Sequence, residues 1–181
     1  MIVEPWLRGT LTDVDAVRRQ VLHALELTLE DGEHWCAPLT DAQMNARPFV
    51  LAPVAFHLRH IARSLDRLLT YVDGARLTPE QHAALASELA PDAITTAVLA
   101  EFRSALASAE TRIRAVAPAA FEWQRHVGRQ RLPTTVAGLL IHCAEHSQRH
   151  IGQAIVTAKV VTQIQEPPTG RPSHPGPPRT T

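Results

Sequence analysis

Apolar residues recur every three or four positions in four long stretches of the chain, a period typical of helices with one buried face. The stretches are residues 14–29, 54–72, 94–116 and a last one that begins at Pro133 or Thr134 and continues to Val161. Pro53 is well placed to begin the second stretch and Gly74 to end it, and Asp31-Gly32 is expected to end the first. The pattern therefore predicts four long amphipathic helices.

The connections between these stretches carry signals for shorter elements. Thr40 and Gln43 fit a capping box for one short helical turn, and Thr78 begins a short helix that is expected to run to about Leu89. Residues 121–135 contain the one plausible extended segment, with a hairpin turn at Gly128. Together these signals predict an all-α fold, a four-helix bundle with short extra helices in the connections.

The domain organisation follows from a change in composition near the end of the chain. Residues 166–181 hold 6 of the 14 prolines, together with Gly, Ser and Thr, and are too polar and stiff to pack. We therefore expect one bundle domain in residues 1–165 and a disordered, Pro-rich tail in residues 166–181.

Charge and cysteine content indicate which partners and which cellular location to expect. Lys and Arg number 18, Asp and Glu also number 18, and the formal net charge is zero, so nothing favours nucleic acid or a membrane as partner. Arg125, His126, Arg129 and Arg131 form a local basic group, which a solvated loop explains better than nucleic-acid binding. Cys36 and Cys143 stand alone without a CxxC motif, and the first ten residues lack the apolar core of a signal peptide, so we expect a cytoplasmic protein.

Five of the ten histidines fall on two of the predicted helices: His57, His60, His142, His146 and His150. Histidines four apart on a helix can converge on one ion, whereas His142 and His150 are about 12 Å apart along the axis. On a helical wheel, His146 and His150 lie closest to the buried face of the last helix. A third ligand must then come from the second helix, where the wheel favours His57 over His60.

The segments that carry these histidines resemble a known family. HLRHIARSLDRLL at residues 57–69, HCAEHSQRHIGQ at 142–153 and LTDAQMNARP at 39–48 are similar to the DinB/YfiT-like superfamily of bacterial metal-binding four-helix bundles. The resemblance spans roughly residues 11–161. It implies that His60, His146 and His150 are the metal ligands and that the protein pairs as a homodimer. Imidazole ligands favour a divalent transition metal, Zn, Ni or Fe, over Mg or Ca.

Two functions are compatible with this site. The resemblance implies a metal-dependent enzyme, either a hydrolase or a low-molecular-weight-thiol S-transferase, that acts on a small-molecule substrate at an open coordination position. The alternative is a non-catalytic metal-binding bundle with a structural role in a stress response. HExxH and the Glu-x-x-His motifs of di-iron bundles are absent from the sequence. No residue can be assigned a catalytic role.

Three further groups are candidates for the surroundings of the site. Trp35, Phe56 and Trp123 are placed where they could wall a pocket around the ion, although each could equally plug one end of the bundle. Glu145 is a possible proton carrier, but the wheel directs it away from His146. His57 and His142 are expected to support the site rather than bind the metal.

Overall fold

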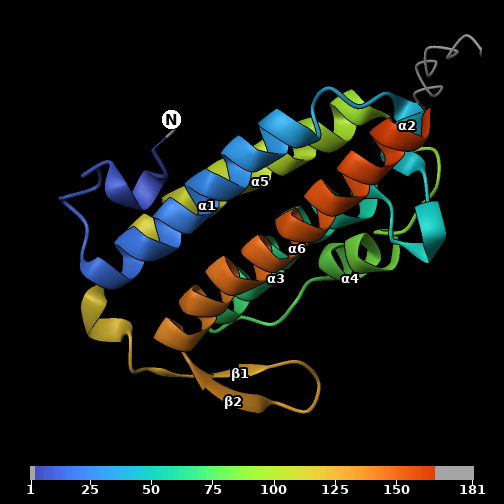
Figure 1. The fold of residues 1–181 in the computed structure, drawn as a ribbon. Helices are drawn as coiled ribbons and strands as arrows, with labels where there is room; N and C mark the ends of the chain where they lie inside the picture. Colours follow the sequence, from blue (N-terminus) through green and yellow to red (C-terminus); the bar gives the residue numbers. More distant parts are fainter. Residues whose placement is uncertain (1–2, 166–181) are drawn as a thin grey trace, which may run out of the picture.

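Four long helices form the body of the protein (Figure 1). The structure is a computed structural model that describes residues 3–165, so the tail predicted for residues 166–181 lies outside the described residues. The long helices are α1 (Ala16–Trp35), α3 (Val54–Val72), α5 (Thr95–Ala115) and α6 (Val136–Gln165). The helix α1 packs against α5 and α6, and α3 packs against the same two helices. The predicted all-α four-helix bundle is therefore confirmed.

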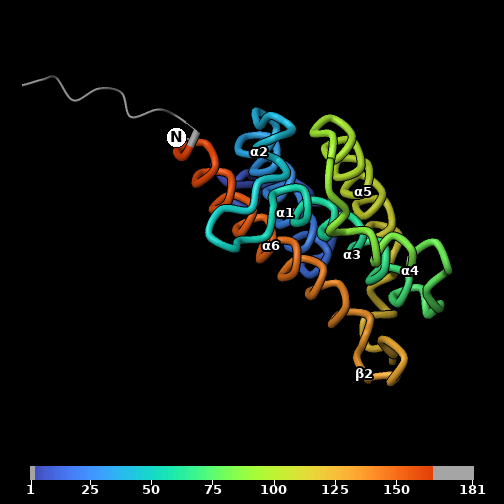
Figure 2. The backbone as a smooth tube through the Cα atoms, turned by 90° about the vertical axis from the view of Figure 1, so that its right-hand side faces the viewer, coloured from blue at the N-terminus to red at the C-terminus, as the bar shows by residue number. Residues whose placement is uncertain are grey.

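Shorter elements occupy the connections. They are the helices α2 (Asp41–Asn45) and α4 (Pro79–Ala86), the 3-10 turns η1 (Pro5–Leu7), η2 (Pro48–Val50) and η3 (Pro118–Ala120), and the antiparallel strands β1 (Gln124–Val127) and β2 (Leu132–Thr135). The view in Figure 2 places α2 near one end of the bundle and the hairpin at the other. The capping boxes of Thr40 with Gln43 and of Thr78 with Gln81 both form. None of the helices described in residues 3–165 is long and apolar enough to cross a membrane.

The core lies between the four long helices and is built from their apolar stripes. Phe102, Leu58, Ile61, Leu140 and Ile151 are among its fully buried side chains. Burying a side chain of this size stabilises the fold by about 1.5–3 kcal/mol, so the stripes explain why these helices associate. Cys36 and Cys143 are buried free thiols, and burial raises the pKa of each to about 12, which leaves them unreactive.

Three helix boundaries differ from the prediction. The short helix α4 ends at Ala86, three residues before the expected Leu89. The first helix does not end at Asp31-Gly32 but continues to Trp35, because Gly32 sits inside α1 where the helix meets the ring of Phe102. A methyl group at position 32 would lie 2.6 Å from Cε1 of Phe102, so the glycine permits close packing instead of ending the helix. The last helix begins at Val136, since Pro133 and Thr134 belong to β2.

Candidate metal centre

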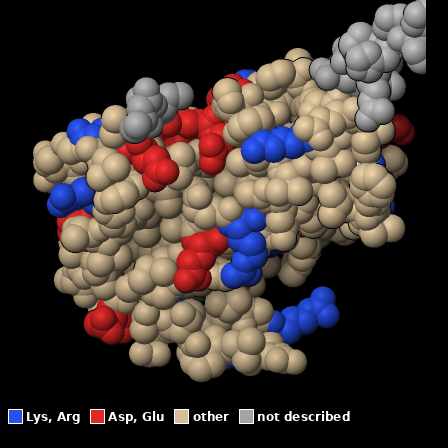
Figure 3. Space-filling view, viewed as in Figure 1, with Lys and Arg blue, Asp and Glu red and all other residues tan. Residues whose placement is uncertain are grey.

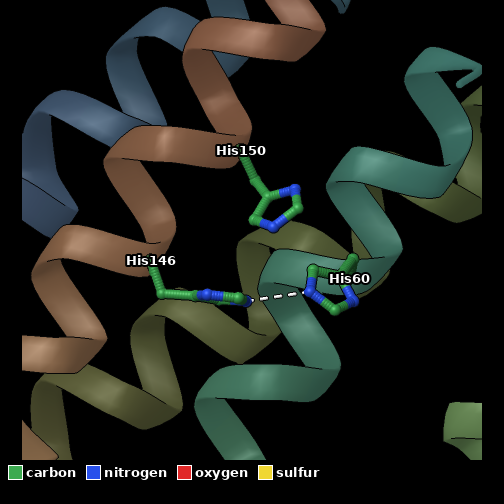
Figure 4. A group of neighbouring side chains, drawn as sticks. All are labelled: His60, His146 and His150. Atoms are coloured by element: carbon green, nitrogen blue, oxygen red, sulfur yellow. Dashed lines mark hydrogen bonds between the residues drawn. The ribbon is translucent and has the colours of Figure 1, made fainter. Parts of the chain in front are cut away.

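Three histidines from α3 and α6 come together on the bundle (Figure 4). One nitrogen from each of His60, His146 and His150 lies within 4.8 Å of the others, and all three side chains are partly exposed. The Nε2 atoms of His60 and His146 are 2.8 Å apart. Two nitrogens on neighbouring positions of one zinc ion are separated by about 3 Å, since each Zn–N bond is about 2.0–2.1 Å. The group could therefore hold a metal ion.

Helix geometry explains why these residues meet. His146 and His150 are one turn apart on α6, so their imidazoles project from the same side of the helix. The helix α3 packs along α6 and brings His60 opposite this pair, with ring centroids 4.8 Å from His146 and 4.3 Å from His150. His146 and His150 have a mutual centroid distance of 4.6 Å.

The second nitrogen of His60 contacts a buried carboxylate that the sequence did not reveal. Nδ1 of His60 lies 2.6 Å from Oε2 of Glu88, whose side chain is 5% exposed. A carboxylate only accepts hydrogen bonds, so Nδ1 of His60 carries the proton and its Nε2 keeps a lone pair, which faces Nε2 of His146. Glu88 also accepts a 2.8 Å hydrogen bond from Nη1 of Arg67. Burial alone would raise the pKa of Glu88, but the bonds from His60 and Arg67 outweigh it and hold the pKa below its usual value.

His57 supports the site from the interior. It is buried, and its Nδ1 lies 3.2 Å from Nδ1 of His150. If the proton resides on Nδ1 of His150, that atom donates to His57 and leaves Nε2 of His150 free to bind a cation. The helical wheel predicted correctly that His57 faces the interior of the bundle. Its ring contacts His150 there, and it does not belong to the group of three.

The electrostatics favour neutral imidazoles. Burial, followed by the mutual repulsion of the neighbouring imidazoles, lowers the pKa of His57, His146 and His150 to about 4. These rings are therefore neutral at pH 7, with a proton on one nitrogen and a lone pair on the other. A metal ion requires this state, because only an unprotonated nitrogen offers a lone pair.

The remaining candidates lie around or away from the group. Of the three aromatic residues expected to wall a pocket, Phe56 stacks on His60 with a centroid distance of 5.3 Å. Trp35 instead packs on His34 and the Lys159 ammonium, and Trp123 is 58% exposed. The side chains of His142 and Glu145 are 45% and 60% exposed. The outward direction expected for Glu145 is confirmed. His142, which was expected to support the site, has its Nδ1 3.5 Å from Oε2 of Glu145 and its ring centroid 5.4 Å from that of His146.

Glu88 and Arg67 are the functional candidates that sequence reasoning missed. Glu88 follows the short helix α4, 28 positions after His60, and no spacing rule relates the two. In the sequence, Arg67 looks like an ordinary charged residue on the solvent-facing side of a helix. In the structure its side chain is only 12% exposed. The segment after α4 packs over α3 and so places Glu88 within hydrogen-bond distance of both His60 and Arg67.

The fold and this site define a helical bundle with a three-histidine group on two adjacent helices. The chain belongs to the DinB superfamily, whose family model matches residues 14–154. A crystal structure of a conserved protein from Enterococcus faecalis is similar to it with a TM-score of 0.67 and 17% sequence identity, over 83% of this chain and 99% of that one. That similarity shows the fold. No curated protein matches the chain.

Proposed function

We propose that this protein is a metal-dependent enzyme in which His60, His146 and His150 hold a divalent transition metal ion, Zn, Ni or Fe. The convergence of three imidazole nitrogens within 4.8 Å carries the proposal. Imidazole ligands favour these metals over Mg and Ca, which prefer oxygen. The pKa values of about 4 for His146 and His150 add support, because both rings are already neutral at pH 7 and each has one nitrogen with a lone pair.

An ion held by three histidines keeps one or more positions for other ligands, as in catalytic zinc sites. The bound ion supplies Lewis acidity, which activates a water molecule or a thiol as nucleophile. This chemistry fits a hydrolase or a low-molecular-weight-thiol S-transferase with a small-molecule substrate. The partial exposure of all three histidines supports access from solvent.

The neighbouring residues position the ligands. Glu88 fixes the proton of His60 on Nδ1, and Arg67 balances the charge of that carboxylate. His57 holds the ring of His150 from behind, and Phe56 covers one face of His60. These contacts restrict ring rotation, so that the lone pairs are held ready for an ion.

The ligand assignment is tested by metal analysis of protein purified without a metal-affinity tag. We expect about one transition metal ion per chain, lost on substitution of any ligand, as in His146→Ala. His142→Ala is the matched control, because it removes an exposed histidine from the same helix and should leave metal content unchanged. Full metal occupancy in His146→Ala would contradict the assignment.

The enzymatic part of the proposal needs a second experiment. The metal-loaded protein is screened against small thiols paired with electrophiles, and against ester and amide substrates. We expect turnover that falls about 100-fold or more in His146→Ala but is kept in His142→Ala. Stoichiometric metal without turnover on any of these substrates would instead favour the alternative of a non-catalytic metal-binding bundle.

A further inference from the structure

A separate cavity of about 770 Å³ lies between the hairpin, the α3–α4 connection and α4. Its volume is in the range of small-molecule pockets, about 300–1,000 Å³. Four arginines and two histidines line it: Arg76, Arg125, Arg129, Arg131, His82 and His126. The residues that line it include no Asp or Glu, and Tyr71, Leu77 and Leu85 add apolar surface. In Figure 3 a hollow separates the hairpin at the lower edge from the helices above, with basic side chains beside it.

The arginines of this cavity differ from most others in the protein. Seven arginines in the described part of the chain form ion pairs with carboxylates: Arg8, Arg18, Arg63, Arg67, Arg103, Arg112 and Arg114. Within residues 3–165 none of the four cavity arginines makes such a pair. The protein as a whole is neutral, so this cavity concentrates positive charge that the surrounding carboxylates do not balance.

The hairpin is held in place over the cavity by one of these arginines. Nε of Arg125 donates a 2.7 Å hydrogen bond to the carbonyl of Val72 at the end of α3. Gly74, two residues further on, has a φ of +77°, a conformation that favours glycine, and Nε of Arg125 lies 3.7 Å from where a Cβ at this position would be. A turn at Gly128 then brings Arg129 and Arg131 to the same cavity. Arg125 thus attaches the hairpin to the end of α3, and Arg129 and Arg131 are exposed beyond the turn.

We propose that this cavity is a binding site for a small organic anion, a phosphate ester or carboxylate with an apolar portion. Guanidinium groups bind both anions through paired hydrogen bonds, and the apolar side chains offer a surface for the rest of the ligand. The site is distinct from the three histidines, because it is built from the hairpin, the α3–α4 connection and α4. A concave cavity in a neutral protein favours a small anion over nucleic acid, which would need an extended basic surface.

The test is calorimetric titration with phenyl phosphate and benzoate, which carry the same ring on different anions, and with benzyl alcohol as neutral counterpart. We expect one or both anions to bind and the alcohol not to bind. The double variant Arg76→Gln/Arg129→Gln should weaken anion binding about tenfold or more. Arg103→Gln/Arg114→Gln, which removes the same charge from exposed ion pairs elsewhere, should leave it unchanged.

Four results would overturn the proposal. These are absence of anion binding, equal binding of benzyl alcohol, equal affinity in the Arg76→Gln/Arg129→Gln variant, and loss of binding when metal is chelated, which would place the anion on the metal. A single-stranded oligonucleotide that binds while phenyl phosphate and benzoate do not would show that the arginines serve nucleic acid. Circular dichroism of both double variants verifies that each remains folded.

Discussion

At the scale of single residues, the contact between Glu88 and His60 is the feature that most changes the chemistry of the site. It selects which nitrogen of His60 is protonated and directs the other toward His146. Such a carboxylate behind a metal-binding histidine fixes the ring and raises its basicity. If the three histidines hold a metal as proposed, Glu88 is a positioning residue, and its loss should weaken metal binding without removing a ligand.

Substitution of Glu88 by Gln keeps the shape of the side chain but removes its charge. We expect metal affinity to fall about 10–100-fold, as is typical when such a supporting carboxylate is lost. Competition with a chromophoric chelator measures this change. Glu33→Gln is the control, because Glu33 pairs with Arg103 between α1 and α5 and should leave affinity within about twofold. Unchanged affinity in Glu88→Gln would show that Glu88 has no part in the site.

Proton release on metal binding tests the lowered pKa values. With pKa values of about 4, His146 and His150 are almost entirely in the neutral form at pH 6, so metal binding to them releases almost no protons. Two histidines with ordinary pKa values near 6.5 would together release about 1.5 protons at that pH. We therefore expect total release below about one proton, the most that His60 alone could add. Calorimetry in buffers of different ionisation enthalpy measures it, and release of about 1.5 protons or more would refute the shifts.

At the scale of helices, Gly32 shows how one small residue sets the distance between α1 and α5. The residue lies inside α1 against the buried ring of Phe102. Alanine is a better helix former than glycine by about 1 kcal/mol, but here its methyl group would collide with that ring. Packing therefore outweighs helix propensity at this position.

We predict that Gly32→Ala destabilises the protein by about 1–3 kcal/mol, the usual cost of overpacking a core. Gly152→Ala, on the exposed side of α6 with no atom within 4 Å of the added methyl group, should stabilise it by about 0.5–1 kcal/mol. Urea denaturation measures both changes. If Gly32→Ala stabilised the protein, the prediction would be wrong, because α1 and α5 would then accommodate the added methyl group without loss of stability.

The helices themselves could be predicted from the sequence, because their apolar stripes are the surfaces that pack. The same stripes placed His146 and His150 on the inner side of the last helix. For the second helix they favoured His57, whereas the histidine that lies with His146 and His150 is His60, which the family resemblance indicated. The physical reason is that α4 and the turn after it cover the outer side of α3, so that a second face of that helix is partly buried around Glu88. Contacts of this kind depend on tertiary packing that no local pattern encodes.

At the scale of the whole molecule, the three histidines join α3 to α6, two helices that are far apart in the sequence. A metal ion held by both would bind the folded chain and not the unfolded one, so it would stabilise the bundle. The site and the fold are thus energetically linked if the proposed ligands are correct.

Thermal unfolding tests this link. At a free metal concentration 100 times the Kd, binding adds about 2.7 kcal/mol to the free energy of unfolding. For a chain of this size we expect the Tm to rise by about 5–10 °C relative to chelated protein. The shift should persist in His142→Ala and vanish in His150→Ala. An identical shift in His150→Ala would place the stabilising metal elsewhere.

The central claim is that one cation is shared by imidazoles of α3 and α6, and anomalous diffraction at the absorption edge of the bound metal tests it most directly. The account predicts a single strong peak about 2.0–2.3 Å from a nitrogen of each of His60, His146 and His150. A peak on any other set of side chains, or no peak in crystals grown with the metal supplied, would contradict it.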